Sequence, residues 1–396
     1  MNRRLSAWLR AAVLVLCAGA GVPLQAQEPA ASAPGATAAP AEPALATSLG
    51  EFVTRVPAGG FTEPALEVTV FKPAGDGPFP IAVINHGRAL GNAHLQPRYR
   101  PLLAAREFVQ RGYAVVVPMR QGFSKSGGNE IGAGCHIGSN GELQAISVRR
   151  TLDWLGTQPW ADVSRNIVMG QSHGGLSTLA YGMQPHPGTR LLVNFAGGLR
   201  KSSCLGWERS MVSAFAAYGA DAKLPSIWFY GDNDSYFPPA LFQEAHQRYV
   251  DSGGRAELVA YGSFGSDAHA MFGSRAGLAV WVPRVMSAIA AAGLPVDKQQ
   301  LISPPGDIDS PQASGFAALD DPDKLPTRSE RARQGYLAWL KAPPPKAFAL
   351  HAGNGSWASA AESLRPLGRA LEACARFAKQ ACRLYAVDDT VVWSPE

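Results

Sequence analysis

The 396-residue sequence is poor in cysteine and has no long basic run. After its first residues, no apolar run approaches the length of a membrane span. Because basic runs and interleaved aromatic and basic residues are missing, nucleic acid is not an expected partner. Neither Cys-x-x-Cys nor closely spaced histidines occur, so we expect no metal site and no cofactor. Hydrophobic residues make up 46% of the chain and charged residues 17%, the composition of a globular protein with a sizeable core.

Residues 1–26 are typical of a secretory signal. Arginines precede a short apolar segment, and Leu24-Gln25-Ala26 provides the small residues of a cleavage site. The apolar segment is too short to cross about 30 Å of hydrocarbon, which disfavours a membrane anchor. Leu16, just before Cys17, is bulkier than lipoprotein processing accepts. Without the three arginines of the leader the formal net charge falls from +5 to +2, and we expect a secreted or periplasmic protein without a stable membrane span.

Export would favour disulfides, because the compartments outside the cytoplasm are oxidising. Four cysteines remain after the leader, and they admit three pairings. We expect Cys374–Cys382, which would join a helix end to the next strand, and Cys135–Cys204, which would join two loops. A metal site is the alternative, but no clustered histidines accompany these cysteines.

Residues 27–48 are almost all Ala, Pro, Ser, Thr and Glu, and are expected to form a disordered tether. Strands and helices then alternate over 49–292. The expected strands are Leu66–Phe71, Ile81–Asn85, Ala114–Val117, Ile167–Met169, Leu191–Ala196, Ile227–Tyr230 and Glu257–Tyr261. The expected helices are Pro101–Arg111, Gly141–Leu155, Gly174–Met183, Trp207–Tyr218, Pro239–Asp251 and Arg275–Ala292. This alternation predicts an α/β domain with a doubly wound, mostly parallel sheet and its catalytic groups at the carboxyl ends of the strands.

Residues 293–342 are polar and proline-rich, a linker with a short helix near its end. The last segment, 343–396, is predicted to be a small βαββ module stapled by Cys374–Cys382. Its strand Lys346–His351 precedes an amphipathic helix, Pro366–Gln380, and a hairpin turns at Asp388-Asp389. We expect this module to dock to a partner or to the cell envelope.

The segment Gly170-Gln171-Ser172-His173-Gly174 follows the apolar run Ile167–Met169 and precedes a helical pattern. Gly-x-Ser-x-Gly between a strand and a helix predicts a nucleophile elbow, a sharp turn that exposes the serine hydroxyl. A serine is a poor nucleophile unless a base removes its proton and an acid orients that base. The sequence must therefore supply both downstream of Ser172.

His269 is the expected base, because it lies in a loop of small residues after the last strand of the sheet. His246 falls inside an amphipathic helix, and His351 belongs to the terminal module. Asp234, after the strand that ends at Tyr230, is the expected acid. Asp232 is the alternative acid, although it is better placed to cap the turn. Asp267 is too close to His269 in sequence to orient it easily.

The oxyanion that forms during acyl transfer needs two fixed N–H donors. We expect them to be the backbone amides of His173 and Arg88, with Gly87 allowing a close approach. The Arg88 guanidinium either binds a substrate carboxylate or is solvated or ion-paired. An apolar substrate pocket is expected from aromatic residues and one histidine in loops that face this corner: His94, Phe123, Trp207, Tyr236 and Phe264. Arg120-Gln121-Gly122-Phe123 is interpreted as a structural turn, and the short segment between Asn194 and Ile227 leaves no room for a large lid.

Together, Gly170–Gly174, Asp234, His269 and His86-Gly87 resemble the α/β-hydrolase superfamily over residues 60–292. The absence of a large cap makes the chain most similar to the dienelactone-hydrolase-like branch. The resemblance implies a Ser172–His269–Asp234 triad that acts on esters or related acyl compounds. True dienelactone hydrolases use a cysteine nucleophile and are cytoplasmic, so the leader and the serine here argue against their aromatic-degradation substrate.

These features predict an exported serine esterase that acts on a small-molecule or polymeric ester. A peptidase or amidase of the same fold is the first alternative. A non-catalytic envelope binding protein on the same scaffold is the second, and the complete set of serine, aspartate and histidine argues against it.

Overall fold

The structure is a computed structural model that describes residues 43–395 apart from Phe61, Pro305, Asp309, Glu362 and Leu364. The expected signal, 1–26, and most of the expected tether, 27–48, lie outside the described residues. Within the described part, no helix combines the length and the apolar character needed to cross a bilayer.

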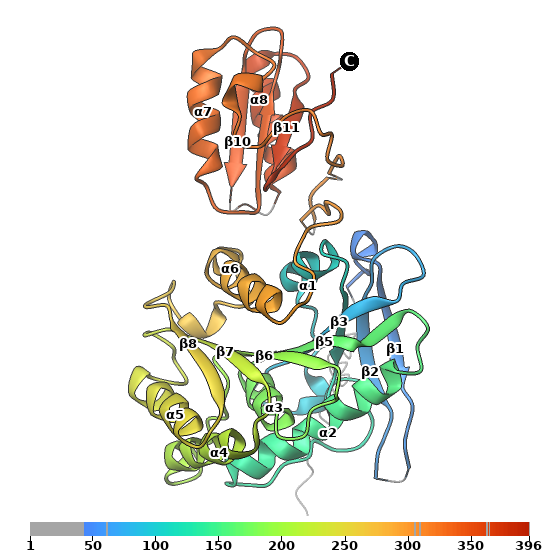
Figure 1. Ribbon diagram of the computed structural model, residues 1–396, viewed down its shortest axis with the longest axis vertical. Coiled ribbons are helices and arrows are strands. Elements are labelled where there is room, and N and C mark those ends of the chain that lie inside the picture. Colours follow the sequence, from blue (N-terminus) through green and yellow to red (C-terminus); the bar gives the residue numbers. More distant parts are fainter. Residues whose placement is uncertain are drawn as a thin grey trace, which may run out of the picture. The chain divides into compact units, whose positions relative to one another are not determined.

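The main domain is built on one eight-stranded sheet with the order β1-β2-β4-β3-β5-β6-β7-β8 (Figure 1). β1 and β2 are antiparallel, β2 runs antiparallel to β4, and every later neighbour is parallel. The strands are β1 (Glu51–Val56), β2 (Leu66–Phe71), β3 (Phe79–Asn85), β4 (Ala114–Pro118), β5 (Ala161–Gln171), β6 (Thr189–Phe195), β7 (Pro225–Tyr230) and β8 (Arg255–Ala260). The order and the helices between the strands confirm the predicted doubly wound α/β class.

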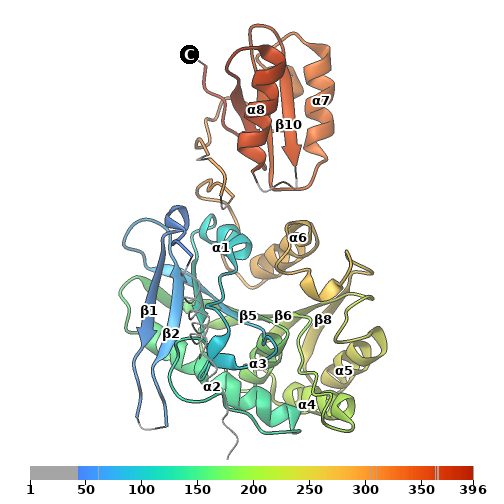
Figure 2. The same ribbon diagram turned by 180° about the vertical axis from the view of Figure 1, so that it is seen from behind.

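Helices cover both faces of this sheet, which explains why its central strands are continuous apolar runs (Figure 2). One face packs against α2 (Ile137–Leu155), α3 (His173–Tyr181), α4 (Trp207–Asp221) and α5 (Pro239–Asp251). The other packs against α1 (Leu102–Val109) and α6 (Arg275–Ala291). Short 3₁₀ turns occur at Thr47–Leu49, Ala93–Leu95, Ala268–Ala270 and Pro322–Lys324. Between β6 and β7 the chain forms only α4, so no large lid lies there.

The C-terminal module has a four-stranded antiparallel sheet of order β10-β9-β11-β12. Its strands are β9 (Lys346–Leu350), β10 (Trp357–Ala361), β11 (Arg383–Val387) and β12 (Thr390–Val391). α8 (Pro366–Ala378) packs on one face through Leu367 and Cys374, and α7 (Glu330–Leu340) packs on the other through Tyr336 and Trp339.

The module therefore differs from the predicted βαββ unit in two ways. β10 is an additional strand, and its Trp-Ala-Ser-Ala-Ala sequence carries little β-propensity by itself. α7 belongs to the module rather than to the linker, because Tyr336 and Trp339 pack on Phe348 of β9, with Tyr336 fully buried and Trp339 nearly so. Phe377 of α8 is 71% exposed.

Candidate active site

Ser172 is held in a strained turn between β5 and α3. Its φ of 56° and ψ of −124° are unusual for a residue with a side chain, and such strain persists only where the surroundings impose it. Its N–H donates to the carbonyl of Phe195 at 3.0 Å, and its own carbonyl accepts from Leu176 and Gly198, each at 3.1 Å. The residue is half-buried, so its hydroxyl remains reachable.

The glycines of the motif are required by close packing. A Cβ at Gly170 would collide with the backbone of Gly174, and a Cβ at Gly174 would collide with the backbone of Asn85 and His86. The next glycine, Gly175, lies equally close to Asn194 and Gly197. The serine turn is thus seated directly against the carboxyl ends of β3 and β6.

Asp234 and His269 form a hydrogen-bonded pair at the same edge of the sheet. The Nδ1 atom of His269 lies 3.0 Å from Oδ2 and 3.2 Å from Oδ1 of Asp234, and the carboxylate side chain has no exposed area. Oδ1 also accepts the N–H groups of Tyr236 at 2.8 Å and Phe237 at 3.0 Å. A carboxylate only accepts, so Nδ1 carries the proton and Nε2 is left as the basic nitrogen.

The loops of His269 and Ser172 are joined next to the serine. Gln171 donates its Nε2–H to the carbonyl of His269 at 2.7 Å. Asp267 accepts from the His269 N–H at 2.9 Å and from the Ser235 hydroxyl at 2.7 Å, so it fixes the backbone of the histidine loop rather than its ring. Among the hydrogen bonds of the described residues, none joins the Ser172 hydroxyl to the His269 ring, and such contacts tighten when substrate binds.

The other sequence candidates lie elsewhere. Asp232 is exposed, and the hydrogen bonds described for the His269 ring are to Asp234. His246 lies on α5 and donates from Nε2 to the carbonyl of Ala256 on β8, and Nδ1 of His351 accepts the N–H of Asn354 in the terminal module.

The loop after β3 lies against the serine. A Cβ on Gly87 would be 3.5 Å from the Ser172 Cβ, so this loop approaches the nucleophile closely. Gln96 fixes the loop from the side, because its Oε1 accepts the N–H of Ala89 at 2.9 Å and its Nε2 donates to the carbonyl of Gly87 at 3.2 Å. The Arg88 guanidinium is ion-paired with Glu130, with nitrogen–oxygen distances of 2.6 and 2.9 Å.

A buried cation lies behind these loops. Arg120, fully buried after β4, donates to the carbonyl of His86 at 2.6 Å, to Gln144 at 2.9 Å and to Nδ1 of His173 at 3.5 Å. Burial lowers the pKa of this guanidinium, and the charge of Glu130 opposes the shift. The local sequence around Arg120 predicts only a structural turn. A charged residue directly after a buried strand was the signal that could have marked it.

The two histidines beside Arg120 are neutral. Burial, followed by the charge of Arg120, holds the pKa of both His86 and His173 well below the ordinary value of 6.5. His86 donates from Nδ1 to the carbonyl of Gly87 at 2.7 Å and accepts at Nε2 from the N–H of Arg120 at 3.0 Å. Both ring nitrogens of His86 are therefore occupied, and this histidine is structural.

The five residues expected to line a substrate pocket lie in different surroundings. The Tyr236 ring lies 4.4 Å from the His269 ring, centroid to centroid, and is 38% exposed. Phe123 has no exposed area and packs on His86, so it is a core residue and cannot line an open pocket. Trp207 packs against the core at the start of α4, Phe264 packs near Tyr261, and His94 is exposed beside Ser124.

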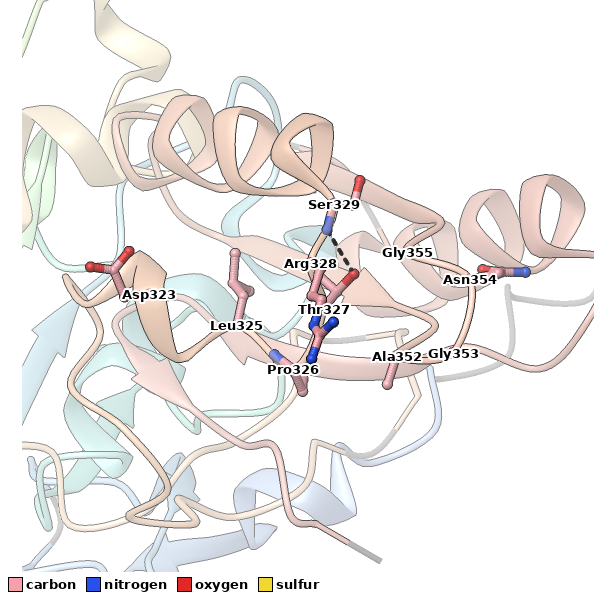
Figure 3. A pocket seen from close by; sticks show the side chains of 10 residues that line it. All are labelled: Asp323, Leu325, Pro326, Thr327, Arg328, Ser329, Ala352, Gly353, Asn354 and Gly355. Carbon is pink, nitrogen blue, oxygen red and sulfur yellow. Dashed lines mark hydrogen bonds between the residues drawn. The ribbon is translucent and has the colours of Figure 1, made fainter.

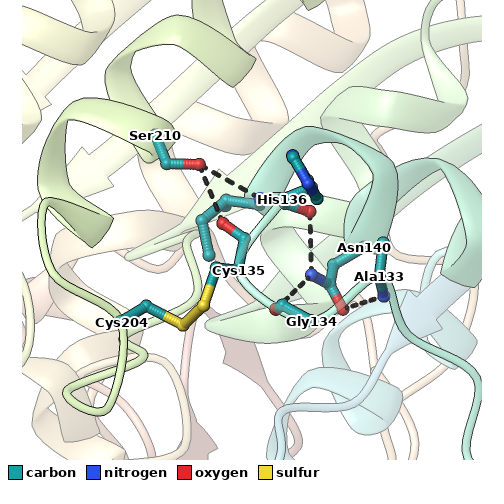
Figure 4. The surroundings of a disulfide bond; sticks show 8 residues. Ala133, Gly134, Cys135, His136, Asn140, Cys204 and Ser210 are labelled. Carbon is teal, nitrogen blue, oxygen red and sulfur yellow. Dashed lines mark hydrogen bonds between the residues drawn. A yellow bond between two sulfur atoms is a disulfide. The ribbon is translucent and has the colours of Figure 1, made fainter.

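A cavity of about 420 Å³ adjoins the serine turn, and side chains of Arg88, Glu130, His173, Leu199, Arg200 and Lys201 line it. The disulfide Cys135–Cys204 links the loops on its two sides, and Figure 4 shows Asn140 and Ser210 holding the Cys135 loop. The second disulfide, Cys374–Cys382, lies in the terminal module. Both pairs are the ones expected from the sequence.

The terminal module has a cavity of its own, about 750 Å³ in volume (Figure 3). It lies between the start of α7, at Arg328 and Ser329, and the turn at Gly353–Gly355. The Ser329 hydroxyl accepts the N–H of Ala332 and caps α7, so this polar group already has a structural role.

Comparison with known proteins finds one family model and several solved structures that are similar to parts of this chain. The family model of X-Pro dipeptidyl-peptidase (S15 family) matches residues 64–223, less than half of the chain. A putative dienelactone hydrolase from Klebsiella pneumoniae is 18% identical, with a TM-score of 0.45, over 61% of this chain and 98% of its own. The esterase Pf2001 from Pyrococcus furiosus is 16% identical, with a TM-score of 0.45, over 62% of this chain and 92% of its own. Dipeptidyl peptidase 4 from Porphyromonas gingivalis is 14% identical, with a TM-score of 0.45, over 61% of this chain and 35% of its own.

No curated protein matches the sequence. The strand order, the serine turn that joins β5 to α3 and the matched family model lead to one assignment. The chain has the α/β-hydrolase fold.

Proposed function

We propose that the chain is an exported serine esterase with Ser172 as nucleophile, His269 as base and Asp234 as orienting acid. The observation that supports this most directly is the buried Asp234 carboxylate on Nδ1 of His269, in a loop joined to the serine turn through Gln171. The two disulfides fit an oxidising compartment, which supports export.

In the proposed reaction, Nε2 of His269 takes the hydroxyl proton while Ser172 Oγ forms a bond to the acyl carbon. The carbonyl oxygen becomes an oxyanion held by the backbone N–H groups of Arg88 and His173. The imidazolium then gives its proton to the departing alcohol as the carbon–oxygen bond breaks, leaving an acyl-serine. Water, deprotonated by His269, attacks the acyl-serine and releases the acid. Asp234 remains ionised and holds the imidazole tautomer throughout.

A peptidase acting through the same residues is the second candidate, and the S15 family match supports it. Amide bonds have a poorer leaving group than esters, so the two candidates differ in how far His269 must protonate the departing atom. Between β6 and β7 the described chain forms only α4, and the lack of an inserted element that could dock a peptide there favours the ester.

The test is labelling by a fluorophosphonate, followed by turnover of p-nitrophenyl acyl esters and of X-Pro p-nitroanilides. We expect the wild type to be labelled on Ser172 and to hydrolyse esters faster than anilides, and Ser172→Ala to lose both the label and turnover. Faster turnover of the anilides would replace the esterase with the peptidase. An unlabelled wild type without turnover would remove the hydrolytic proposal and favour a binding protein.

A further inference from the structure

A hydrogen-bond donor without a partner is buried next to the cavity beside the serine turn. Arg120 only donates, so the contact from its Nη2 to Nδ1 of His173 makes Nδ1 an acceptor. Burial and nearby positive charges keep the ring neutral, and its single proton is therefore on Nε2. That nitrogen is buried and has no partner in the described part of the chain, although His173 lines the cavity. A buried N–H group without an acceptor lowers the stability of the fold unless a ligand accepts a hydrogen bond from it.

The charges that line this cavity do not balance. Arg88 and Glu130 neutralise each other in a bidentate pair. Arg200 donates to the backbone carbonyl of Ser235 at 3.0 Å, which leaves its charge uncompensated. Within the part of the chain that the structure describes, neither Arg200 nor Lys201 has an acidic side chain within 4.0 Å. The cavity is therefore lined by two positively charged residues without an acidic partner, next to one buried neutral N–H donor.

The position of the cavity indicates which part of a substrate enters it. Its lining includes the side chains of Arg88 and His173, the residues whose amides are proposed to hold the oxyanion. It does not include His269 or Asp234, next to which the leaving alcohol must lie to receive its proton. The substituent that reaches the cavity is thus the acyl group.

The walls of the cavity are fixed before any ligand binds. Asn140 accepts the N–H of Ala133 at 2.9 Å and donates to the carbonyl of His136 at 2.8 Å, which holds one wall (Figure 4). The disulfide Cys135–Cys204 connects that wall to the segment that follows Lys201. A preformed site loses little entropy when it binds.

We propose that this cavity is an anion-binding acyl subsite, and that the enzyme prefers esters whose acyl group ends in a carboxylate, such as half-esters of dicarboxylic acids. The carboxylate accepts from Nε2 of His173 and pairs with Lys201 and Arg200. This inference rests on the proposed esterase function and adds its substrate class.

The experiment compares kcat/KM for three p-nitrophenyl esters of similar size and different charge: hemiglutarate, valerate and δ-aminovalerate. Rates of Ser172→Ala are subtracted, because the carboxylate of the hemiglutarate can attack its own ester. In the wild type we expect kcat/KM to be highest for the anionic hemiglutarate, lower for the neutral valerate and lowest for the cationic δ-aminovalerate. Lys201→Met should lower the hemiglutarate-to-valerate ratio by about tenfold, the value of one charge-assisted hydrogen bond, and adding Arg200→Met should lower it further. Lys223→Met, an exposed lysine far from the cavity, is the matched control and should leave the ratio unchanged.

Binding is tested separately by the rise in melting temperature that free glutarate produces, compared with valerate. Stabilisation of the wild type by glutarate, lost in the Arg200→Met/Lys201→Met double variant, supports the subsite even if no ester is hydrolysed. Equal rates for the three esters overturn the inference while the labelled Ser172 preserves the esterase proposal. An anionic preference that survives in the double variant overturns it as well.

Discussion

At the scale of single residues, Asp234 is the most constrained group of the site. Its Oδ1 accepts two backbone N–H groups and its Oδ2 faces Nδ1 of His269, while its side chain has no exposed area. These bonds fix the direction of the carboxylate before the imidazole is considered. They explain why Asp234, and not the exposed Asp232, can orient the histidine.

Replacing Asp234 by Asn tests this role. The amide keeps the shape of the side chain, but its N–H₂ can face Nδ1 and stabilise the wrong tautomer of His269. We expect kcat to fall by about 10³–10⁴-fold, with a smaller change in KM, in steady-state hydrolysis of a p-nitrophenyl ester.

Asp232→Asn is the matched control, since it makes the same chemical change two residues away on the exposed side of the turn. Its kcat should stay within a factor of about two of the wild type, because it touches no proposed catalytic atom. If Asp232→Asn lost activity and Asp234→Asn kept it, the assignment of the acid would be reversed.

At the scale of elements, the sequence predicted those strands that are buried on both faces. Each of β3 to β7 contains an apolar run, and such runs are distinctive because a parallel sheet covered by helices leaves no polar face. β1 was not predicted, because it is an edge strand in which buried and more exposed residues alternate. The buried side chain of its Glu51 forms ion pairs with Arg98 and Arg100. β10 was not predicted, because its small residues have little tendency to form a strand until they pair with β9.

The site was predictable only where its residues belong to a local pattern. Ser172 follows from Gly-x-Ser-x-Gly, and Asp234 and His269 follow from their positions after strands. Arg120 and the cavity of Lys201 depend on how loops from β3, β4 and β6 meet, and no local spacing contains that information. Phe123 was assigned to the pocket for the same reason: an aromatic residue in a loop can face the core or the substrate, and packing on His86 decides it.

The Cys135–Cys204 disulfide offers a prediction about the loops that it joins. It closes a separation of 69 residues and borders the cavity, so the variant Cys135→Ala/Cys204→Ala should lose about 2–4 kcal/mol of unfolding free energy. It should also raise KM for p-nitrophenyl hemiglutarate more than it lowers kcat, because the loops of Asp234 and His269 are not tethered by this bond. Urea unfolding and steady-state kinetics measure the two effects.

The second disulfide gives the control for this experiment. Cys374→Ala/Cys382→Ala removes a bond of 8 residues' separation inside the terminal module, so it should destabilise that module and leave KM unchanged. Equal effects of the two double variants on KM would mean that the Cys135–Cys204 bond has no particular influence on the cavity.

At the scale of the whole molecule, buried charges connect segments that are far apart in sequence. Arg106 of α1 is 2% exposed, and it donates to the carbonyl of Ile302 at 2.6 Å and to Asp388 of the β11–β12 turn at 2.7 Å. The neighbouring pair Lys298–Asp389 lies at 2.8 Å. These contacts connect the segment after α6 and the β11–β12 turn to Arg106 of α1. Docking of the module to the cell envelope is a separate proposal.

The buried neutral histidines make the stability of the molecule sensitive to mild acid. His86 and His173 have folded pKa values well below 6.5, so the unfolded chain binds more protons than the native state just below that pH. The free energy of unfolding therefore increases with pH in this range and decreases as the pH falls below about 6.5. Each histidine changes the free energy of unfolding by up to about 1.4 kcal/mol per pH unit, and the two together by up to about 2.7 kcal/mol per pH unit. We expect urea midpoints to fall steeply between pH 6.5 and 5.5.

Three variants test whether the pH dependence of stability comes from His86 and His173. His86→Asn or His173→Asn should each remove about half of this pH dependence, whatever the change in absolute stability at pH 7.5, because one proton-binding difference disappears. The variant His136→Gln changes an exposed histidine away from this buried pair, and it should keep the full dependence. A urea midpoint that stays constant from pH 7.5 to 5.5 in the wild type would mean that both buried rings accept a proton without leaving the folded state, and that Arg120 does not oppose their charge.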